Sequence, residues 1–301
     1  MTGFPTIFFI FAIQFTISMR TGLVLEGGAL RGMFTAGVTD VFMEHGIQFD
    51  GIIGVSAGAA FGVNIKSHQI GRAVRYNVKY AHDWHYSGIR TWIQHGDLYN
   101  AQFAYHDIPD KYDVFDNDTF EKDPTEFYVV CTDVETGRPV YQKCMQGGDR
   151  LYEWIRASAS MPIAAKVVHL EGKRLLDGGI ADSIPLAYFQ SIGFEKNVVI
   201  LTQPQGYMKK KMKIQPLFHL WLHQYPAVVK ALAQRYIMYN QELRYLAQQE
   251  RLGKTLVICP EETLPIARVS HDPEKMLQTY QIGRRAACQV LDKVMDFLDM
   301  R

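Results

Sequence analysis

The chain has almost no excess of charge of either sign. Its 32 Lys and Arg residues nearly balance 31 Asp and Glu residues, which leaves a formal net charge of +1 at pH 7. Proteins that bind nucleic acid in general carry a basic patch or stripe that contacts phosphates. The sequence lacks such a stripe, so we expect no nucleic-acid partner.

Cysteine is also scarce, with four residues that lie far apart and form no Cys-x-x-Cys pair: Cys131, Cys144, Cys259 and Cys288. This pattern favours reduced thiols over a disulfide scaffold, and it predicts a reducing, cytoplasmic location. A hairpin that places Cys131 opposite Cys144 is a second interpretation, and two separately buried thiols are favoured over it.

No Pro/Gly/Ser-rich linker, charge block or internal repeat divides the 301 residues, of which 48% are hydrophobic and 21% charged. This composition predicts one domain over residues 19–301. The apolar run before it has no preceding Lys or Arg and no Ala-x-Ala cleavage site, and it is shorter than the roughly 20 residues of a spanning helix. We therefore expect residues 1–18 to be an extension outside the core, with a short anchor on the inner membrane surface as the alternative.

Strand-like and helix-like runs alternate along the rest of the chain, which predicts an α/β fold with a mostly parallel sheet and helices on both faces. The predicted strands are 22–26, 51–55, 126–132, 137–142, 197–202 and 255–259. The predicted helices are 33–45, 57–66, 69–81, 149–158, 185–191, 218–251 and 273–299.

The candidate nucleophile lies in Gly54-Val55-Ser56-Ala57-Gly58, between an apolar strand and a run of small residues that can start a helix. Such a strained strand-to-helix turn presents a serine hydroxyl at the end of a sheet. A turn whose glycines serve only close packing is the alternative. We take Ser56 as the nucleophile because other motifs support it.

A glycine-rich loop, Gly27-Gly28-Ala29-Leu30-Arg31-Gly32, follows the first predicted strand and points backbone N–H groups at an anion. A dinucleotide site would need an acidic residue closing the second strand, and a P-loop would need Gly-Lys-Ser/Thr; both are absent. The remaining interpretation is an oxyanion hole formed by N–H groups of Gly27, Gly28 or Ala29 together with that of Ala57.

A third motif is Leu175-Leu176-Asp177-Gly178-Gly179, in which the glycines leave the carboxylate room to approach another loop. By itself Asp-Gly-Gly is also a common turn sequence. The motif becomes informative because it follows the glycine-rich loop and the Gly-x-Ser-x-Gly motif in the chain.

A glycine loop ending in Arg-Gly, then Gly-x-Ser-x-Gly, then Asp-Gly-Gly resembles the patatin-like phospholipases. The resemblance runs from Gly22 to about Gln203 and includes the segments 132–137 and 157–162. It implies a patatin-like three-layer fold and an acyl hydrolase that uses a Ser-Asp dyad, without histidine, metal or cofactor. The implied substrates are phospholipids, lysophospholipids or other acyl esters.

Carried over by position, the resemblance makes Ser56 the nucleophile and Asp177 its base. The supporting positions are Arg31, Gly32, Gly54, Gly58, Gly178 and Gly179. The chain departs from the family at Ala29, where a third glycine is usual, and the alanine methyl disfavours a positive φ. A carboxylate is a weak base toward an alcohol, so Asp177 must lie in a desolvated pocket that raises its pKa.

Two alternatives remain open on the residues alone. A Ser-His-Asp enzyme of the α/β-hydrolase type would use His219, His223 or His271, although each is better explained as a surface or helix-cap residue. A catalytically idle lipid-binding or scaffold protein of the same fold is the other alternative. The His219/His223 pair lacks the accompanying Glu of a His-Glu-x-x-His zinc site, so we expect no metal.

Two further segments bear on the substrate. Residues 83–121 are rich in aromatic side chains and either form a wall of an acyl pocket or pack as an ordinary connection. Lys209-Lys210-Lys211-Met212-Lys213 lies near several aromatic residues and is either a solvated loop or a contact to an anionic membrane.

Overall fold

The computed structural model describes residues 19–88, 91–93, 96–211 and 222–300. The proposed extension at residues 1–18, His219 and Lys213 lie outside these described residues. No helix within the described ranges is long and apolar enough to cross a membrane.

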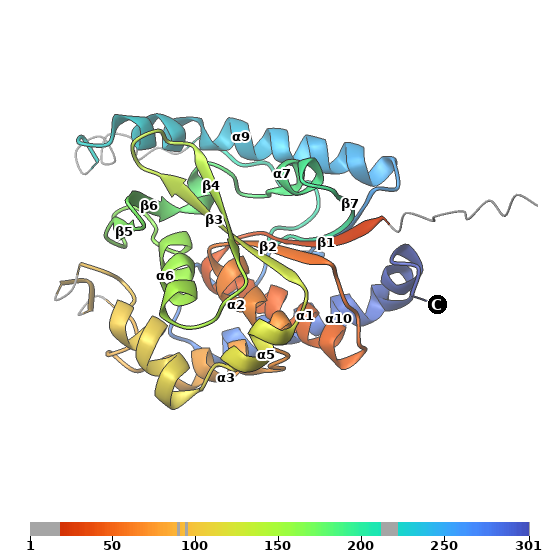
Figure 1. The fold of residues 1–301 in the computed structure, drawn as a ribbon, viewed down its shortest axis with the longest axis horizontal. Helices are drawn as coiled ribbons and strands as arrows, with labels where there is room; N and C mark the ends of the chain where they lie inside the picture. Colours follow the sequence, from red (N-terminus) through yellow and green to blue (C-terminus); the bar gives the residue numbers. More distant parts are fainter. Residues whose placement is uncertain (1–18, 89–90, 94–95, 212–221, 301) are drawn as a thin grey trace, which may run out of the picture.

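A sheet of eight strands forms the centre of the molecule, in the order β5-β6-β3-β2-β1-β7-β8, with β4 paired to β3 (Figure 1). The strands are β1 (Arg20–Leu25), β2 (Gly51–Val55), β3 (Glu126–Asp133), β4 (Pro139–Cys144), β5 (Val168–Leu170), β6 (Lys173–Asp177), β7 (Phe194–Ile200) and β8 (Thr255–Ile258). Pairing is parallel from β3 through β2, β1 and β7 to β8, whereas β4, β5 and β6 join antiparallel.

The helices cover both faces of this sheet. They are α1 (Gly32–Glu44), α2 (Ala57–Lys66), α3 (Arg72–Lys79), α5 (Asn117–Lys122), α6 (Asp149–Ser158), α7 (Leu186–Ser191), α9 (Pro226–Arg251) and α10 (Pro273–Phe297). Short 3-10 turns span Ala29–Arg31 and Gly178–Ile180, and a π-helix spans Phe103–Tyr112.

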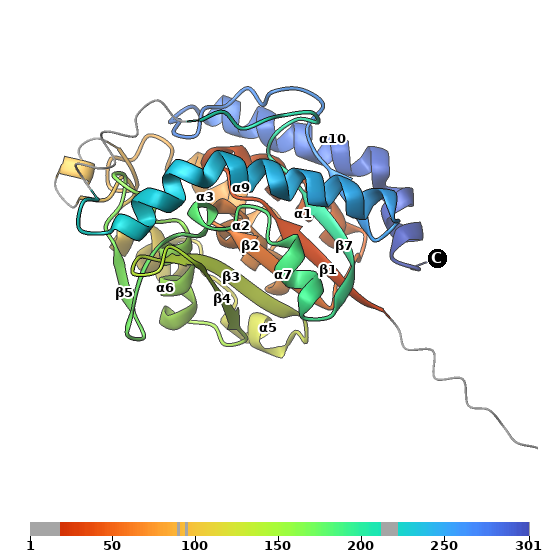
Figure 2. The ribbon, with the colours of Figure 1, turned by 90° about the horizontal axis from the view of Figure 1, so that it is seen from above.

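Side chains point alternately to the two faces along each buried strand, so the hydrophobic core has one part on each face of the sheet. Leu23, Leu25 and Ile52 pack on the side of α1, α2 and α10. Val24 and Ile53 point the other way and pack with residues of α7 and α9. Figure 2 shows α9 running across one face of the sheet, with α1 and α2 beneath it. The α/β fold with three layers, predicted from the sequence, is therefore confirmed.

Most element boundaries agree with the prediction to within a few residues, and two differ for visible reasons. Helix α3 begins at Arg72 because Gly71 has φ 74°. Helix α9 begins at Pro226, since residues 222–225 form a turn. In the β3–β4 hairpin Cys131 lies opposite Val140 and Cys144 opposite Phe127, so the two thiols do not face each other; all four cysteines are free.

Candidate active site

Ser56 occupies a tight turn between the end of β2 and the start of α2. Its backbone has φ 55° and ψ −120°, in the left-handed half of conformational space that non-glycine residues rarely adopt. The flanking glycines permit this turn: a Cβ on Gly54 would lie 2.6 Å from the backbone of Ala59, and one on Gly58 would lie 2.4 Å from Leu25 O. The strained turn predicted from the motif is confirmed.

The hydroxyl of Ser158, at the end of α6, holds this turn in place. This hydroxyl accepts a hydrogen bond from Ser56 N at 2.8 Å and donates one to Val130 O at 2.6 Å. The bridge joins the backbone of Ser56 to β3. Sequence analysis missed this role, because the only available signal was the small-residue segment that contains Ser158.

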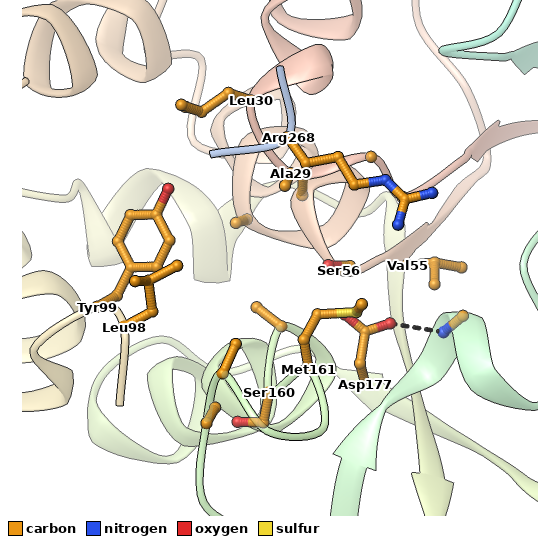
Figure 3. Close-up of a pocket in the computed structure, with 18 of the residues that line it drawn as sticks. Ala29, Leu30, Val55, Ser56, Leu98, Tyr99, Ser160, Met161, Asp177 and Arg268 are labelled. Carbon is orange, nitrogen blue, oxygen red and sulfur yellow. Dashed lines mark hydrogen bonds between the residues drawn. The ribbon is translucent and has the colours of Figure 1, made fainter. Parts of the chain in front are cut away.

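Asp177 is the last residue of β6, which pairs with β3 so that Asp177 lies opposite Cys131. Its backbone N donates to Ser160 O at 2.8 Å, and its Oδ1 accepts from Gly179 N at 2.8 Å (Figure 3). Gly178 packs directly against β3, because a Cβ at this position would lie 2.1 Å from Val130 O. The Oδ2 atom is buried and has no hydrogen bond to a described residue.

Burial raises the pKa of Asp177 above its ordinary value. The positive charge of Arg235, the Ser56 hydroxyl and the Gly179 N–H lower the pKa of Asp177 and only partly offset this effect. The Ser56 hydroxyl therefore lies near enough to stabilise the carboxylate. The desolvated environment expected for Asp177 is confirmed.

The glycine-rich loop lies beside Ser56. Gly27 packs against β2, because a Cβ at this position would lie 2.9 Å from Val55 O. Gly32 packs against the Phe61 ring, which a Cβ on Gly32 would approach to 2.8 Å. Ala29 has φ 49° despite its methyl group. The loop is held in this shape by hydrogen bonds from Leu30 N to Arg268 O at 3.3 Å and from Arg31 N to Gly28 O at 3.2 Å.

These residues line a cavity of about 260 Å³. Ser56, Asp177, Ala57 and the loop Gly27–Arg31 form one wall. Aromatic and aliphatic side chains of the 83–121 segment form another wall, among them Tyr86, Leu98, Tyr99 and Tyr105. In Figure 3, Leu98 and Tyr99 lie to one side of Ser56 and the Arg268 side chain to the other. Of the two interpretations of this segment, the structure supports the pocket wall; that the pocket holds an acyl chain stays a prediction.

Histidine is absent from the cavity walls in the part of the chain that the structure describes. The His271 ring lies 2.9 Å from Ala81 O, and His223 is exposed. A separate group, His106, Asp110 and Asp149, brings potential metal-ligand atoms within 4.8 Å of one another, but both carboxylates are exposed and none of the three residues lines the cavity.

Comparison with protein families matches residues 23–189 to a model described as patatin-like phospholipase. This match covers more than half of the chain and contains Ser56, Asp177 and the glycine loop. The chain belongs to the patatin-like phospholipase family. A second model, a domain of unknown function, matches residues 225–299, which hold α9, β8 and α10.

Similar proteins support this membership. The chain is 31% identical over 198 residues to "Uncharacterized protein YjjU" of Escherichia coli, an alignment that covers 62% of this chain and 52% of that protein. It is 24% identical over 291 residues to "Lysophospholipase NTE1" of Chaetomium globosum, covering 91% of this chain and 18% of that protein. The chain thus spans about half of the first relative and less than a fifth of the second.

Among solved structures, VipD from Legionella pneumophila matches with a TM-score of 0.46 and 12% identity, covering 91% of this chain and 67% of that one. This likeness carries no part of the argument.

The cavity beside Ser56 is also lined by cations that sequence analysis did not place there: Arg235 from α9, Arg268 from the loop before α10, and Lys209 after β7. Lys209 belongs to the lysine run that was interpreted as a solvated loop or a membrane contact. A fully solvated position is wrong for this residue, because its side chain lines the cavity and its ammonium lies 4.0 Å from the centre of the Tyr239 ring. The membrane contact of the lysine run stays a prediction. Periodicity alone could not identify these residues, because each lies far from the motifs in sequence.

Proposed function

We propose that this protein is a serine acyl hydrolase that cleaves carboxylic esters of lipids, with Ser56 as nucleophile and Asp177 as general base. The observation that carries the proposal is the buried Asp177 carboxylate, which has one oxygen without a hydrogen bond to the described residues and lies beside the Ser56 hydroxyl. Family membership and the names of the lysophospholipase relatives support a lipid ester as substrate.

In the acylation step, Ser56 Oγ attacks the carbonyl carbon of the ester while its proton passes to Asp177 Oδ2. The raised pKa of Asp177 makes it a better acceptor of this proton than an exposed aspartate. Negative charge develops on the carbonyl oxygen. The N–H groups of Gly28, Ala29 and Ala57 stabilise it, and no hydrogen bond between described residues uses the N–H of Gly28 or Ala29.

The intermediate then collapses with cleavage of the ester C–O bond, and the leaving alcohol takes the proton from Asp177. Deacylation repeats these steps with water: Asp177 accepts a proton from the water as it attacks the acyl-enzyme, and returns it to Ser56 Oγ. The apolar wall with Tyr99 and Leu98 holds the acyl chain. We propose a cytoplasmic enzyme that meets lipid at the inner membrane surface.

Hydrolysis of p-nitrophenyl butyrate by purified variants tests this assignment. Ser56→Ala removes the nucleophile and Asp177→Asn removes the base, so each should lower kcat/KM by at least about 10²- to 10³-fold. Circular dichroism should show an unchanged fold.

Ser191→Ala is the matched control, because Ser191 is an exposed serine on α7 whose hydroxyl donates only to Tyr188 O. Its activity should equal that of the wild type. Near-normal turnover in Ser56→Ala or in Asp177→Asn would exclude the proposed pair, and loss of activity only after replacement of a histidine would favour the α/β-hydrolase type of site.

A further inference from the structure

The cavity around Ser56 carries more positive charge than its own acidic groups balance. Arg31, Lys209, Arg235 and Arg268 all line it, and the acidic residues in its walls are Glu26, Asp97 and Asp177. Arg156, a further cation in the lining, is paired with Glu153 at 2.6 Å. The other cations form no ion pair with any acidic side chain of the described ranges.

The acidic groups of the cavity already have partners. Glu26 accepts hydrogen bonds from Thr202 N at 2.6 Å and from the Tyr239 hydroxyl at 2.6 Å. Asp97 accepts one from Lys166 N at 2.6 Å. Asp177 accepts one from Gly179 N. These donors are neutral, so they hold the carboxylates in place without changing their charge. The four cations still outnumber the three acidic groups, which leaves an excess of positive charge in a partly buried space, where uncompensated charge is costly.

These cations repel one another, and the repulsion lowers the pKa of Lys209 and of Arg235. Burial lowers the pKa of Lys209 to about 7, and the charges of Arg235, Arg268 and Arg31 add to this effect. Burial and Arg268 likewise lower the pKa of Arg235, although Asp177 opposes them. An anion bound among these side chains would remove the repulsion and favour their charged forms.

One nitrogen of the Arg235 guanidinium anchors the side chain, and the other two have N–H groups available for a ligand. Its Nε donates to Gly179 O, and its Nη2 would lie 3.0 Å from a Cβ at Gly179. Its Nη1 and Nη2 donate no hydrogen bond to a described residue. A planar guanidinium with free parallel N–H groups matches the oxygens of a phosphate.

The position of the cations relative to Ser56 fits a substrate with an acyl chain and a charged end. Lys209, Arg235 and Arg268 also line a second cavity of about 270 Å³, which adjoins the first through these side chains. In Figure 3 the Arg268 guanidinium lies on the opposite side of Ser56 from Tyr99 and Leu98. An ester at Ser56 would thus have its acyl chain toward Tyr99 and its alcohol part toward the cations.

We propose that Lys209, Arg235 and Arg268 bind the phosphate of a lysophospholipid or phospholipid substrate while its ester lies at Ser56. This inference rests on the proposed function, which it extends to the substrate's head group. All three residues lie outside residues 23–189, so the family match does not contain them. The C-terminal part of the chain thereby sets substrate choice for a catalytic pair that lies in the N-terminal part.

The test compares two substrates with the same acyl chain, a lysophosphatidylglycerol and the neutral monoacylglycerol, presented in neutral detergent micelles. Arg268→Gln is the first variant, because the Arg268 side chain is exposed at the cavity and only its backbone O bonds to Leu30 N. A lost charge-assisted contact corresponds to roughly 10- to 100-fold in kcat/KM. We expect that loss for the phospholipid and a change of less than about twofold for the monoacylglycerol.

Lys211→Gln is the matched control, since it removes the same charge from an exposed lysine that lines neither cavity. It should leave both substrates unchanged. Lys209→Met, which keeps the apolar stem against Tyr239, should reproduce the effect of Arg268→Gln. Equal losses on both substrates, or an equal loss in Lys211→Gln, would overturn the phosphate site.

Inorganic phosphate distinguishes a head-group site from a site for a free anion. If phosphate inhibits the wild type competitively and Arg268→Gln weakens both this inhibition and phospholipid hydrolysis, the substrate proposal holds. Weaker phosphate inhibition with unchanged substrate preference would overturn it in favour of a free-anion site. A wild type that hydrolyses the monoacylglycerol but shows no preference for the phospholipid contradicts this inference alone, whereas no hydrolysis of any ester contradicts the proposed function and this inference with it.

Discussion

At the scale of single residues, the backbone at the site is held in conformations that L-amino acids avoid. Ala29 has φ 49° and Ser56 has φ 55°, and such conformations cost about 1–3 kcal/mol each. Strain of this kind persists where the surroundings fix the chain, as Ser158 does for Ser56 N at 2.8 Å. In the proposed mechanism, these two strained residues flank the carbonyl oxygen of the substrate.

Ala29→Gly should therefore relieve strain without removing a hydrogen-bond donor. We expect full esterase activity and a stability equal to the wild type or up to about 1 kcal/mol higher in chemical denaturation, because glycine adopts positive φ freely. Gly28→Ala is the contrasting variant. Its Cβ would lie 2.6 Å from Thr202 Oγ1, so it should lose both stability and activity. Destabilisation by Ala29→Gly would show that the methyl group contributes packing that outweighs the strain.

At the scale of elements, sequence patterns predicted those parts of the site that are regular and buried. Strands β1 and β2 and helices α1 and α2 follow from apolar runs bounded by glycines, and they position the glycine loop and Ser56. Strands β5 and β6 were missed, because β5 has only 3 residues and β6 begins with Lys173-Arg174. Local pattern does not reveal such short strands. They form through pairing, β6 with β3 and β5 with β6.

The same limit applies to the 83–121 segment. Its π-helix, Phe103–Tyr112, contains Pro109, which a sequence reading treats as a helix breaker. Its aromatic content left a pocket wall and ordinary packing both open, and only the fold reveals which rings face the cavity. Likewise, tertiary packing brings the cations of α9 and of the loop before α10 to the cavity, and no sequence motif indicates this.

Two half-buried acidic residues, Glu242 on α9 and Asp182 in the turn that follows Asp177, lie close together. The Tyr141 hydroxyl donates to Asp182 Oδ2 at 2.6 Å, and Glu242 Oε1 accepts from Ser183 N at 3.1 Å. Burial raises the pKa of both carboxyls, and the charge of Asp182 further raises that of Glu242. The folded state therefore prefers a protonated pair, and this contribution to stability is present below the ordinary carboxyl pKa and is lost as pH rises through the raised pKa.

Glu242→Gln should make stability less dependent on pH. We expect the variant to unfold at a higher temperature than the wild type at pH 8, with the difference shrinking as pH falls toward 5, because only the wild type must ionise a buried carboxyl. Glu250→Gln, at an exposed position on the same helix, should follow the wild type at every pH. Parallel curves for Glu242→Gln and the wild type would contradict the raised pKa of Glu242 in the folded state.

At the scale of the whole molecule, the C-terminal helices pack into the core of the family-matched region. Helices α1 and α10 approach so closely that a Cβ on Gly37 would lie 2.1 Å from Tyr280 O, and one on Gly283 would lie 2.0 Å from Phe34 O. Tyr280 also donates to the buried Asp40 at 2.7 Å. We therefore propose that residues 19–301 fold as one cooperative domain.

Gly283→Ala tests this packing. The added methyl group must push α10 away from α1, which should cost about 1–3 kcal/mol in the free energy of unfolding. If the chain is one cooperative unit, a single transition should shift when it is followed by circular dichroism and by tryptophan fluorescence. Gln289→Ala, on the exposed side of α10, should leave the transition in place. Separate transitions for the two probes would instead indicate that residues 225–299 unfold independently.

The central claim, that Ser56 is an activated nucleophile, is tested most directly by covalent labelling. A fluorophosphonate probe reacts with a serine hydroxyl only where a base and an oxyanion site assist the attack. We predict one adduct per chain, located by mass spectrometry on the peptide that contains Ser56, slower labelling in Asp177→Asn, and none in Ser56→Ala. A wild-type protein that stays unlabelled while remaining folded, or an adduct that persists in Ser56→Ala, would contradict the account.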